Sequence, residues 1–274
     1  MTPEPPLPKR MRKNQTMSTS TTAAETAIQE AASSLTAAAA DLVTTQSEAI
    51  ARAVALVMES LTDDGIVQVF GTGHSKGFAM EIAGRAGGLV PANQLAIKDV
   101  VMLGDRSPAD VVTPEAERRP GFAHEVLALH RIHPADVFMI ASNSGGNGVT
   151  VEMALEAQRR GHKVIAVTSL RHSERIASRH PSGKRLFEIA DVVIDNCAPF
   201  GDASRDVGGG LAVTSVSTVT AAYVAQMITA GVVAEFQARG EGAPVLVSAN
   251  IAGGDAHNEA LWARYAGRIN EQEP

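Results

Sequence analysis

The stretch of sequence that decides the fold is IVQVFGTGHS, residues 66–75. Ile66–Phe70 form a short apolar run, which is typical of a strand buried inside a parallel sheet. The residues that follow, Gly71-Thr72-Gly73-His74-Ser75, combine glycines with hydroxyl side chains. Because ligands of open α/β folds bind beyond the carboxyl ends of the strands, this loop is the first candidate for a binding site.

Four more runs of the same kind follow along the chain. We expect strands at 89–91, 137–141, 164–167 and 192–194, with helical stretches between them. Short apolar strands that alternate with helices predict an α/β protein with a parallel sheet covered on both faces. The predicted fold is therefore a three-layer, doubly wound, five-stranded parallel sheet with N-terminal helices.

The composition divides the chain into four parts. We expect a disordered tail at residues 1–20, a helical segment at 21–64, the α/β domain at 65–240 with an insertion at about 95–135, and a helical C-terminal segment at 241–274. Ile28, Leu35 and Leu42 recur every seven residues, which predicts one long helix or two consecutive helices. Either Met1 or Met17 can be the first residue of the protein.

The uncharged stretch 211–234 is long enough to cross a bilayer. Its many Ser and Thr residues favour a helix buried inside the protein, so no membrane is expected as a partner.

The overall composition excludes several classes of protein. The 274 residues include a single cysteine, Cys197, so an internal disulfide is excluded and a reducing cytoplasm is the expected compartment. The net charge of −6 argues against a nucleic-acid partner. No metal site is expected, because His130 and His133 have the spacing of ligands but no third ligand and are interpreted as surface residues.

Three strand ends share the same polar character. The second is Ser142-Asn143-Ser144-Gly145-Gly146-Asn147, and the third is Thr168-Ser169. Backbone amides and hydroxyl groups at such loops can hold a phosphate without any lysine. The alternative is that each Ser or Thr only caps the following helix. Three such loops together favour an anion site.

Two nucleotide-binding patterns compete with this interpretation. Gly71, Gly73 and Gly77 are spaced almost as in a dinucleotide-binding loop, but no acidic residue stands near the end of the second predicted strand. The loop also lacks the GxxxxGK[ST] pattern of a nucleotide P-loop. No cofactor is therefore expected.

These motifs resemble the SIS (sugar isomerase) domain family over about residues 35–240. The resemblance rests on FGTGHS (70–75), SNSG (142–145) and VIAVTS (164–169), and RAGGLVP (85–91), SRHPSGKRL (178–186) and VIDNCAPFGDA (193–203) resemble a stand-alone, poorly characterised subfamily. It implies a flavodoxin-like sheet, a phosphorylated sugar or amino sugar as ligand, and a homodimer or homotetramer. It also implies that Ser142, Ser144, Thr168 and Ser169 hold the phosphate, while Thr72, His74 and Ser75 face the sugar.

The candidate catalytic residues are Glu81, His180 and His74. Aldose–ketose isomerisation needs a base beside the carbonyl and a group that opens the sugar ring. Glu81 is the candidate base, although an i,i+4 ion pair with Arg85 is its simpler role. Arg85 stands where several SIS relatives have an acid. His180 lies among Arg179, Lys184 and Arg185, and His74 lies between Gly73 and Ser75.

The predicted function is a phosphosugar-binding protein, with sugar-phosphate isomerisation through an enediol as the reaction. The alternatives are a lyase or etherase that uses the same site, a sugar-phosphate sensor without turnover, and a nicotinamide-dependent oxidoreductase. A DNA-binding regulator is disfavoured, because one helical segment and about 20 residues precede the core.

Overall fold

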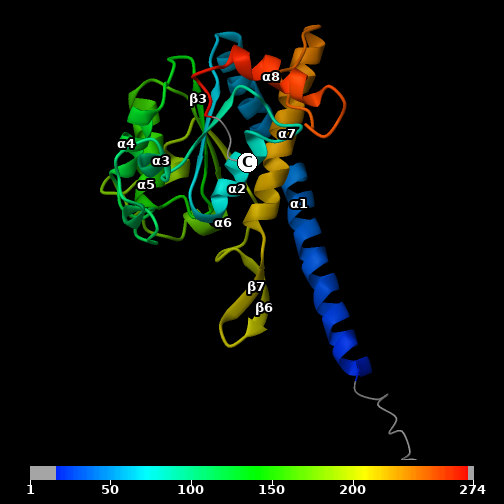
Figure 1. The fold of residues 1–274 in the computed structure, drawn as a ribbon. Coiled ribbons are helices and arrows are strands. Elements are labelled where there is room, and N and C mark those ends of the chain that lie inside the picture. Colours follow the sequence, from blue (N-terminus) through cyan, green and yellow to red (C-terminus); the bar gives the residue numbers. More distant parts are fainter. Residues whose placement is uncertain (1–16, 271–274) are drawn as a thin grey trace, which may run out of the picture.

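The computed structural model describes residues 17–270, with side chains from residue 22 onward. Five parallel strands form the central sheet in the order β2-β1-β3-β4-β5. The strands are β1 (Val67–Gly71), β2 (Ala92–Leu95), β3 (Val137–Ala141), β4 (Val164–Thr168) and β5 (Val192–Asp195). This topology confirms the predicted flavodoxin-like sheet (Figure 1).

One predicted strand was placed wrongly. Residues 89–91 precede β2, and Leu89 forms only isolated bridges to Ala83 and Val245. Pro91 has no backbone N–H to give to a ladder, and its carbonyl oxygen accepts a hydrogen bond from Val67 N at the start of the β1–β2 pairing. The strand therefore begins at Ala92.

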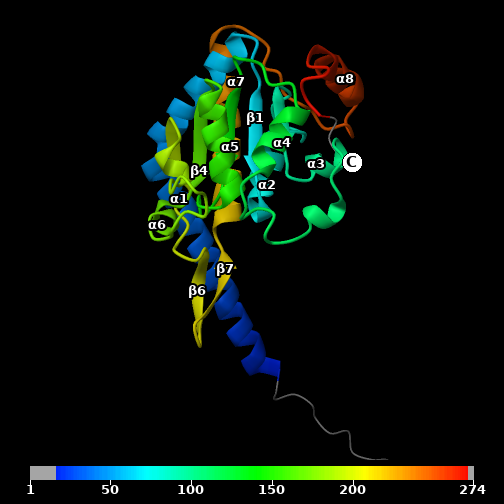
Figure 2. The ribbon, with the colours of Figure 1, turned by 90° about the vertical axis from the view of Figure 1, so that its left-hand side faces the viewer.

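Helices cover both faces of the sheet, as expected. One face packs on α1 (Met17–Thr62), α2 (Lys76–Ile82) and α7 (Ser217–Ala238) through side chains such as Val69 and Met139. The other face packs on α4 (Phe122–Leu129) and α5 (Gly148–Arg159) through side chains such as Phe70 and Ile140. Residues alternate between the two faces because successive strand side chains point in opposite directions. Figures 1 and 2 show the three layers.

The N-terminal segment is one continuous helix of 46 residues, α1. Its second half buries Leu42, Ile50 and Val57 in the core. Its first half extends away from the body beside a two-stranded hairpin of β6 (Ala203–Gly208) and β7 (Leu211–Ser215), as Figures 1 and 2 show. Arg205 Nε and Glu30 Oε2 are 2.7 Å apart and join the hairpin to the helix.

The expectation of one helix over residues 211–234 is wrong at its beginning. Residues 211–215 belong to β7, and α7 begins only at Ser217. Gly209 and Gly210 have positive φ and form the tight turn of the hairpin, and Gly208 at the end of β6 also has a positive φ. Of the described helices, α7 alone has the length and apolarity of a membrane span, and in the fold it packs against α1 and α2.

The stretch 95–135 connects β2 to β3. It contains α3 (Asp99–Met102), a short 3-10 helix η2 (Pro108–Asp110) and α4. Phe122 and Val126 of α4 belong to the buried core. The prediction that His130 is a surface residue is wrong, because its side chain is 2% exposed and its Nε2 lies 2.9 Å from Asp99 Oδ2.

The C-terminal segment lies at the amino ends of the strands, opposite the predicted site. Its helix α8 spans Gly254–Arg264, four residues earlier than the expected start at Asn258. Arg268 Nη2 donates to the buried carboxylate of Asp136 at 2.8 Å, which fixes this segment to the start of β3. Of the expected tail at 1–20, residues 1–16 lie outside the described residues, and α1 begins at Met17.

Candidate functional site

The candidate site lies where the strand order reverses, between β1 and β3. From β1 the chain crosses to β2 on one side, whereas from β3 it continues to β4 on the other side. A crevice forms at such a switch point beyond the carboxyl ends of the strands. The structure brings His74 and Ser75 of the β1 loop together with Ser142 and Asn143 of the β3 loop around one small pocket.

The loop after β1 folds back tightly on itself. A β-carbon on Gly71 would lie 2.4 Å from Ser75 O, so only glycine fits at this position. Ser75 N donates to Thr72 O at 3.0 Å and closes the turn that includes the 3-10 helix η1 (Gly73–Ser75). The turn leaves the His74 side chain exposed at the edge of the pocket.

The loop after β3 is the better candidate for an anion cradle. Ser142 Oγ accepts a hydrogen bond from Gly145 N at 3.1 Å. Gly145 has a φ of +62°, and a β-carbon there would lie 2.8 Å from Ser173 Oγ. Within the described part of the chain, the amides of Ser144, Gly146 and Asn147 donate to no protein group. Free amides in a loop of this kind attract anions.

The first turn of α5 contributes less than the sequence suggests. Gly148 N donates to Arg118 O at 3.2 Å, and Val149 N donates to Glu117 O at 3.4 Å. The β2–β3 connection therefore caps this helix, and the free amides belong to the loop before it.

Thr168 and Ser169 are fully buried beneath the loops. The Thr168 hydroxyl donates to Asn143 O at 3.3 Å, and the Ser169 hydroxyl donates to Ala198 O at 2.7 Å. Ser169 Oγ also accepts from His172 N, as an N-cap of the short helix α6 (Leu170–Ser173). These bonds hold the strand ends together, and direct phosphate contact by Thr168 and Ser169 stays a prediction.

The structure adds Asn196, which the sequence reasoning did not select, and it places residues from the start of α7 at the same pocket. Asn196 is buried after β5, lines the pocket, and donates from Nδ2 to Asn143 Oδ1 at 3.1 Å. Ser217 and Thr218 close the pocket from the start of α7. Asp202 accepts hydrogen bonds from Val216 N and Ser217 N, which makes it the cap of that helix. The position of Asn196 directly after a strand is the signal that could have identified it.

Glu81 is not part of the pocket. Its carboxylate accepts hydrogen bonds from Arg85, in an i,i+4 ion pair, and from Gln226 Nε2 of α7. Six residues beyond Ser75 correspond to about 9 Å along a helix. The structure thus shows the simpler role of Glu81, and its role as a base stays a prediction.

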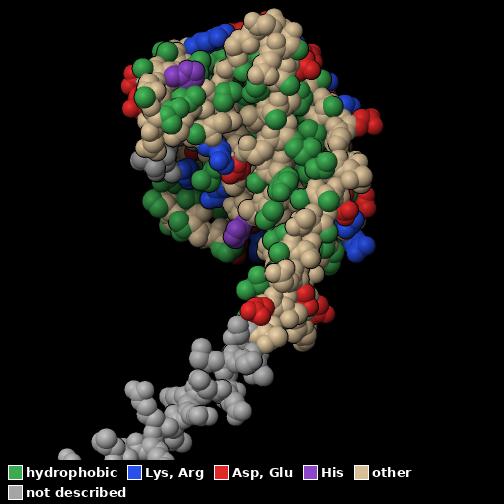
Figure 3. All heavy atoms as spheres, turned by 90° about the vertical axis from the view of Figure 1, so that its right-hand side faces the viewer, with side chains coloured by type: hydrophobic (Ala, Val, Ile, Leu, Met, Phe, Trp, Pro, Cys, Tyr) green, Lys and Arg blue, Asp and Glu red, His purple; other side chains and the backbone are tan. Residues whose placement is uncertain are grey.

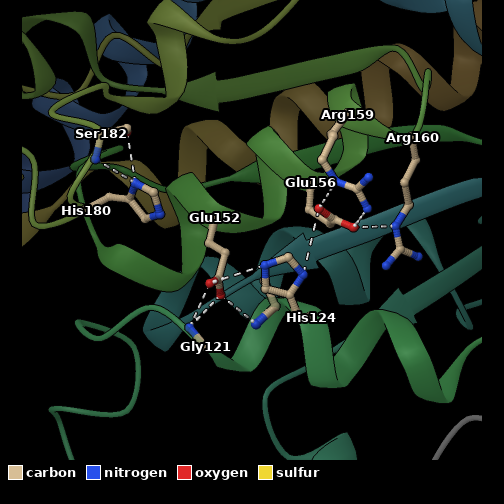
Figure 4. A network of polar contacts seen from close by, with 9 residues as sticks. Gly121, His124, Glu152, Glu156, Arg159, Arg160, His180 and Ser182 are labelled. Carbon is tan, nitrogen blue, oxygen red and sulfur yellow. Dashed lines mark hydrogen bonds and ion pairs between the residues drawn. The ribbon is translucent and has the colours of Figure 1, made fainter.

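The basic loop around His180 lies against the β3 loop. Arg179 N donates to Gly146 O at 2.8 Å, and Arg179 Nη1 donates to Asn147 Oδ1 at 3.1 Å. The His180 ring is turned to Ser182, with Nδ1 2.9 Å from Ser182 Oγ (Figure 4). Arg179 therefore brings positive charge to the free amides, while His180 faces its own loop.

Glu152 of α5 fixes the segment that crosses the switch point. Its buried carboxylate accepts from Gly121 N at 2.7 Å and from Ala123 N at 3.0 Å, at the start of α4 (Figure 4). His124 Nε2 lies 3.8 Å from Glu152 Oε1. Among the described residues, no group of His, Cys, Asp and Glu has the arrangement of a metal site.

The sheet order and the amide-rich crevice define a class: doubly wound α/β proteins that bind a ligand at the switch point. A family model described as the SIS domain matches residues 32–169, and the chain belongs to this family.

The curated relatives span most of the chain. It is 39% identical over 222 residues to the UPF0309 protein BH3325 of Halalkalibacterium halodurans, covering 81% of this chain and 90% of that protein. It is also 39% identical over 232 residues to the UPF0309 protein lmo0025 of Listeria monocytogenes, covering 84% and 93%.

Solved structures confirm the fold. A phosphoheptose isomerase from Francisella tularensis has a TM-score of 0.51 at 18% identity, covering 75% of this chain and 95% of that one. The phosphoheptose isomerase from Neisseria gonorrhoeae has the same TM-score and identity, covering 77% and 98%.

Proposed function

We propose that this protein binds a phosphorylated sugar or amino sugar and interconverts its aldose and ketose forms through an enediol. The observation that carries the proposal is the set of free amides of Ser144, Gly146 and Asn147, in the β3 loop whose Ser142 and Asn143 line one pocket with His74 at the switch point of an SIS fold. The amides, with Ser142 and Ser144, anchor the phosphate, and the anchored phosphate positions the reacting carbons.

The histidines have separate roles in this proposal. His74 lies exposed at the pocket edge and contacts the sugar. His180 belongs to the basic loop that docks on Gly146 through Arg179, and it opens the sugar ring once that loop closes over the ligand.

The test is a turnover assay by proton NMR. The purified chain is incubated with aldose and ketose phosphates of five to seven carbons and with amino-sugar 6-phosphates. We expect one aldose–ketose pair to interconvert without added cofactor. Binding without any conversion would reject the isomerase and leave the second candidate, a sugar-phosphate sensor. One observation favours that candidate: the Glu81 carboxylate already has Arg85 and Gln226 as partners.

In this proposal the protein is a homodimer or homotetramer, and a further copy of the chain packs against the projecting arm. Three apolar side chains of the projecting hairpin are exposed, with Leu211 at 67%, Val207 at 47% and Val213 at 46%. Figure 3 shows that hydrophobic side chains also spread over the adjoining helical face. An arm of this shape and polarity is typical of a surface that another subunit covers.

A further inference from the structure

Glu117 lies at the switch point and has no role in the function as derived so far. It belongs to the segment between η2 and α4, and Glu152 holds the end of this segment at Gly121. The carbonyl oxygens of Glu117 and Arg118 accept hydrogen bonds from Val149 N and Gly148 N, directly after the loop with the free amides.

The Glu117 side chain points at the other loop of the site. A β-carbon on Gly73 would lie 3.4 Å from Glu117 Oε2. The carboxylate thus lies on the side of Gly73 that a side chain would occupy, while the backbone of Glu117 borders the loop of Ser144. It bridges the two loops that form the pocket.

The Glu117 carboxylate is also available for proton transfer. The side chain is half-buried, and among the described residues it makes no hydrogen bond and no ion pair. The other acids near the switch point are occupied: Glu152 accepts backbone amides, Asp202 caps α7, and Glu81 pairs with Arg85. A half-buried carboxylate without a partner is unfavourable for stability alone, which favours a role in the site.

From this geometry we infer that Glu117 is the acid–base residue of the site, in place of Glu81. The inference rests on the proposed function. In the reaction, the Glu117 carboxylate takes the proton from C2 of the open-chain aldose. The C–H electron pair forms the C1=C2 double bond, and the carbonyl oxygen O1 takes a proton from solvent. The O2 hydroxyl then loses its proton to solvent as C2=O forms, and C1 takes the proton back from Glu117. No oxidant or reductant is consumed.

The test follows exchange and binding in the same variants. Wild-type protein, Glu117→Gln, Glu117→Asp and Glu81→Gln are incubated in D2O with arabinose 5-phosphate, fructose 6-phosphate, sedoheptulose 7-phosphate and glucosamine 6-phosphate. Proton NMR measures deuterium entering the carbon beside the carbonyl, and the shift in melting temperature measures binding. Glu115→Gln is the matched control, because it removes an exposed carboxylate two residues away in the same segment.

We expect Glu117→Gln to slow exchange by on the order of 100-fold or more while the melting shift with ligand stays as in the wild type. Glu117→Asp should recover part of the rate, and Glu81→Gln and Glu115→Gln should exchange normally.

Exchange at the wild-type rate in Glu117→Gln would overturn the role of Glu117 and leave the isomerase intact. Wild-type protein that binds a probe without exchange would overturn both the isomerase and the role of Glu117. Wild-type protein that binds no probe would overturn the proposed function as a whole.

Discussion

At the scale of single residues, glycines decide the shape of the site. Gly71 allows Ser75 O to come close, and Gly145 turns the β3 loop with a positive φ above Ser173 and Thr168. These turns place Ser75 of the β1 loop and Ser142 of the β3 loop around one pocket. The absence of a side chain at Gly71 and Gly145 therefore matters for the shape of the site as much as the hydroxyl groups do.

Gly145→Ala tests this point. We expect it to lower the free energy of unfolding by about 2 kcal/mol, because alanine strains the backbone and its β-carbon meets Ser173 Oγ at 2.8 Å and Thr168 Oγ1 at 3.0 Å. Urea unfolding measures the change. Gly183→Ala is the control, since Gly183 also has a positive φ but open space around it. Equal losses in the two variants would contradict the steric argument.

The residues that the sequence identifies are those next to strand ends. The alternation of apolar runs with GTGHS and SNSGGN predicts both loops of the pocket, because parallel strands place their carboxyl ends at one edge. Glu117 was missed, since only tertiary packing brings the β2–β3 connection to that edge, whereas Asn196 directly follows β5 and could have been identified in the same way as the two loops. Glu81 was selected from chain proximity, and its partner Gln226 on a distant helix was not visible in the sequence.

At the scale of elements, α5 links the site to the rest of the fold. Its first residues are capped by the segment of Glu117, and its last turn carries Glu156, whose side chain is 3% exposed. Hydrogen bonds from Arg159 and Arg160 lower the pKa of the Glu156 carboxyl to about 2, against the opposing effect of burial.

The depressed pKa of Glu156 predicts acid lability. A carboxyl with a folded pKa of about 2 and an ordinary value of 4.5 stabilises the fold above pH 4.5, and this contribution is lost as the pH falls towards 2. We expect Glu156→Gln to lose roughly 1–3 kcal/mol at pH 7 and to depend less on pH, as measured by urea unfolding.

The control for this prediction is Glu48→Gln, which removes an exposed i,i+4 pair with Arg52 and should change stability by less than about 0.5 kcal/mol. A pH profile of Glu156→Gln that runs parallel to the wild type would contradict the assignment.

The elements themselves were largely predictable, with exceptions at β2, α1 and β7. The heptad spacing left open whether α1 is one helix or two, because periodicity alone does not locate a break. The sequence predicts a glycine-rich loop over β6 and the start of a helix over β7, because an uncharged stretch fits either a helix or a strand. The shape of the hairpin depends on positive φ at Gly208–Gly210.

At the scale of the whole molecule, the arm formed by the first half of α1 and the hairpin extends away from the body (Figure 2). A two-stranded hairpin has little stability by itself. The proposed second copy supplies the missing contacts, and it would bring a neighbouring subunit beside the pocket, since Ser217 of the pocket follows β7 directly.

The double variant Leu211→Asp/Val213→Asp tests the arm. Sedimentation should show the wild type as a dimer or tetramer and the variant as a smaller species, because charges on both exposed side chains oppose burial. Val112→Asp is the control, since Val112 is 76% exposed on the body of the protein. A monomeric wild type, or a variant of unchanged mass, would contradict the proposed assembly.

In the proposed function, the loop after β3 holds the phosphate of a sugar through its free amides and the Ser144 hydroxyl. The most direct measurement is the shift in melting temperature of the wild type and Ser144→Ala with sugar phosphates, amino-sugar phosphates, inorganic phosphate and NAD. Ser144 is half-buried in the loop, and Ser33→Ala on the exposed face of α1 is the control. A ligand at 100 times its Kd stabilises by about 2.7 kcal/mol, a rise of several degrees for a chain of this size. We expect a sugar phosphate to raise the melting temperature of the wild type and of Ser33→Ala. The rise should be much smaller in Ser144→Ala. A rise with NAD alone, or an equal rise in Ser144→Ala, would contradict this expectation.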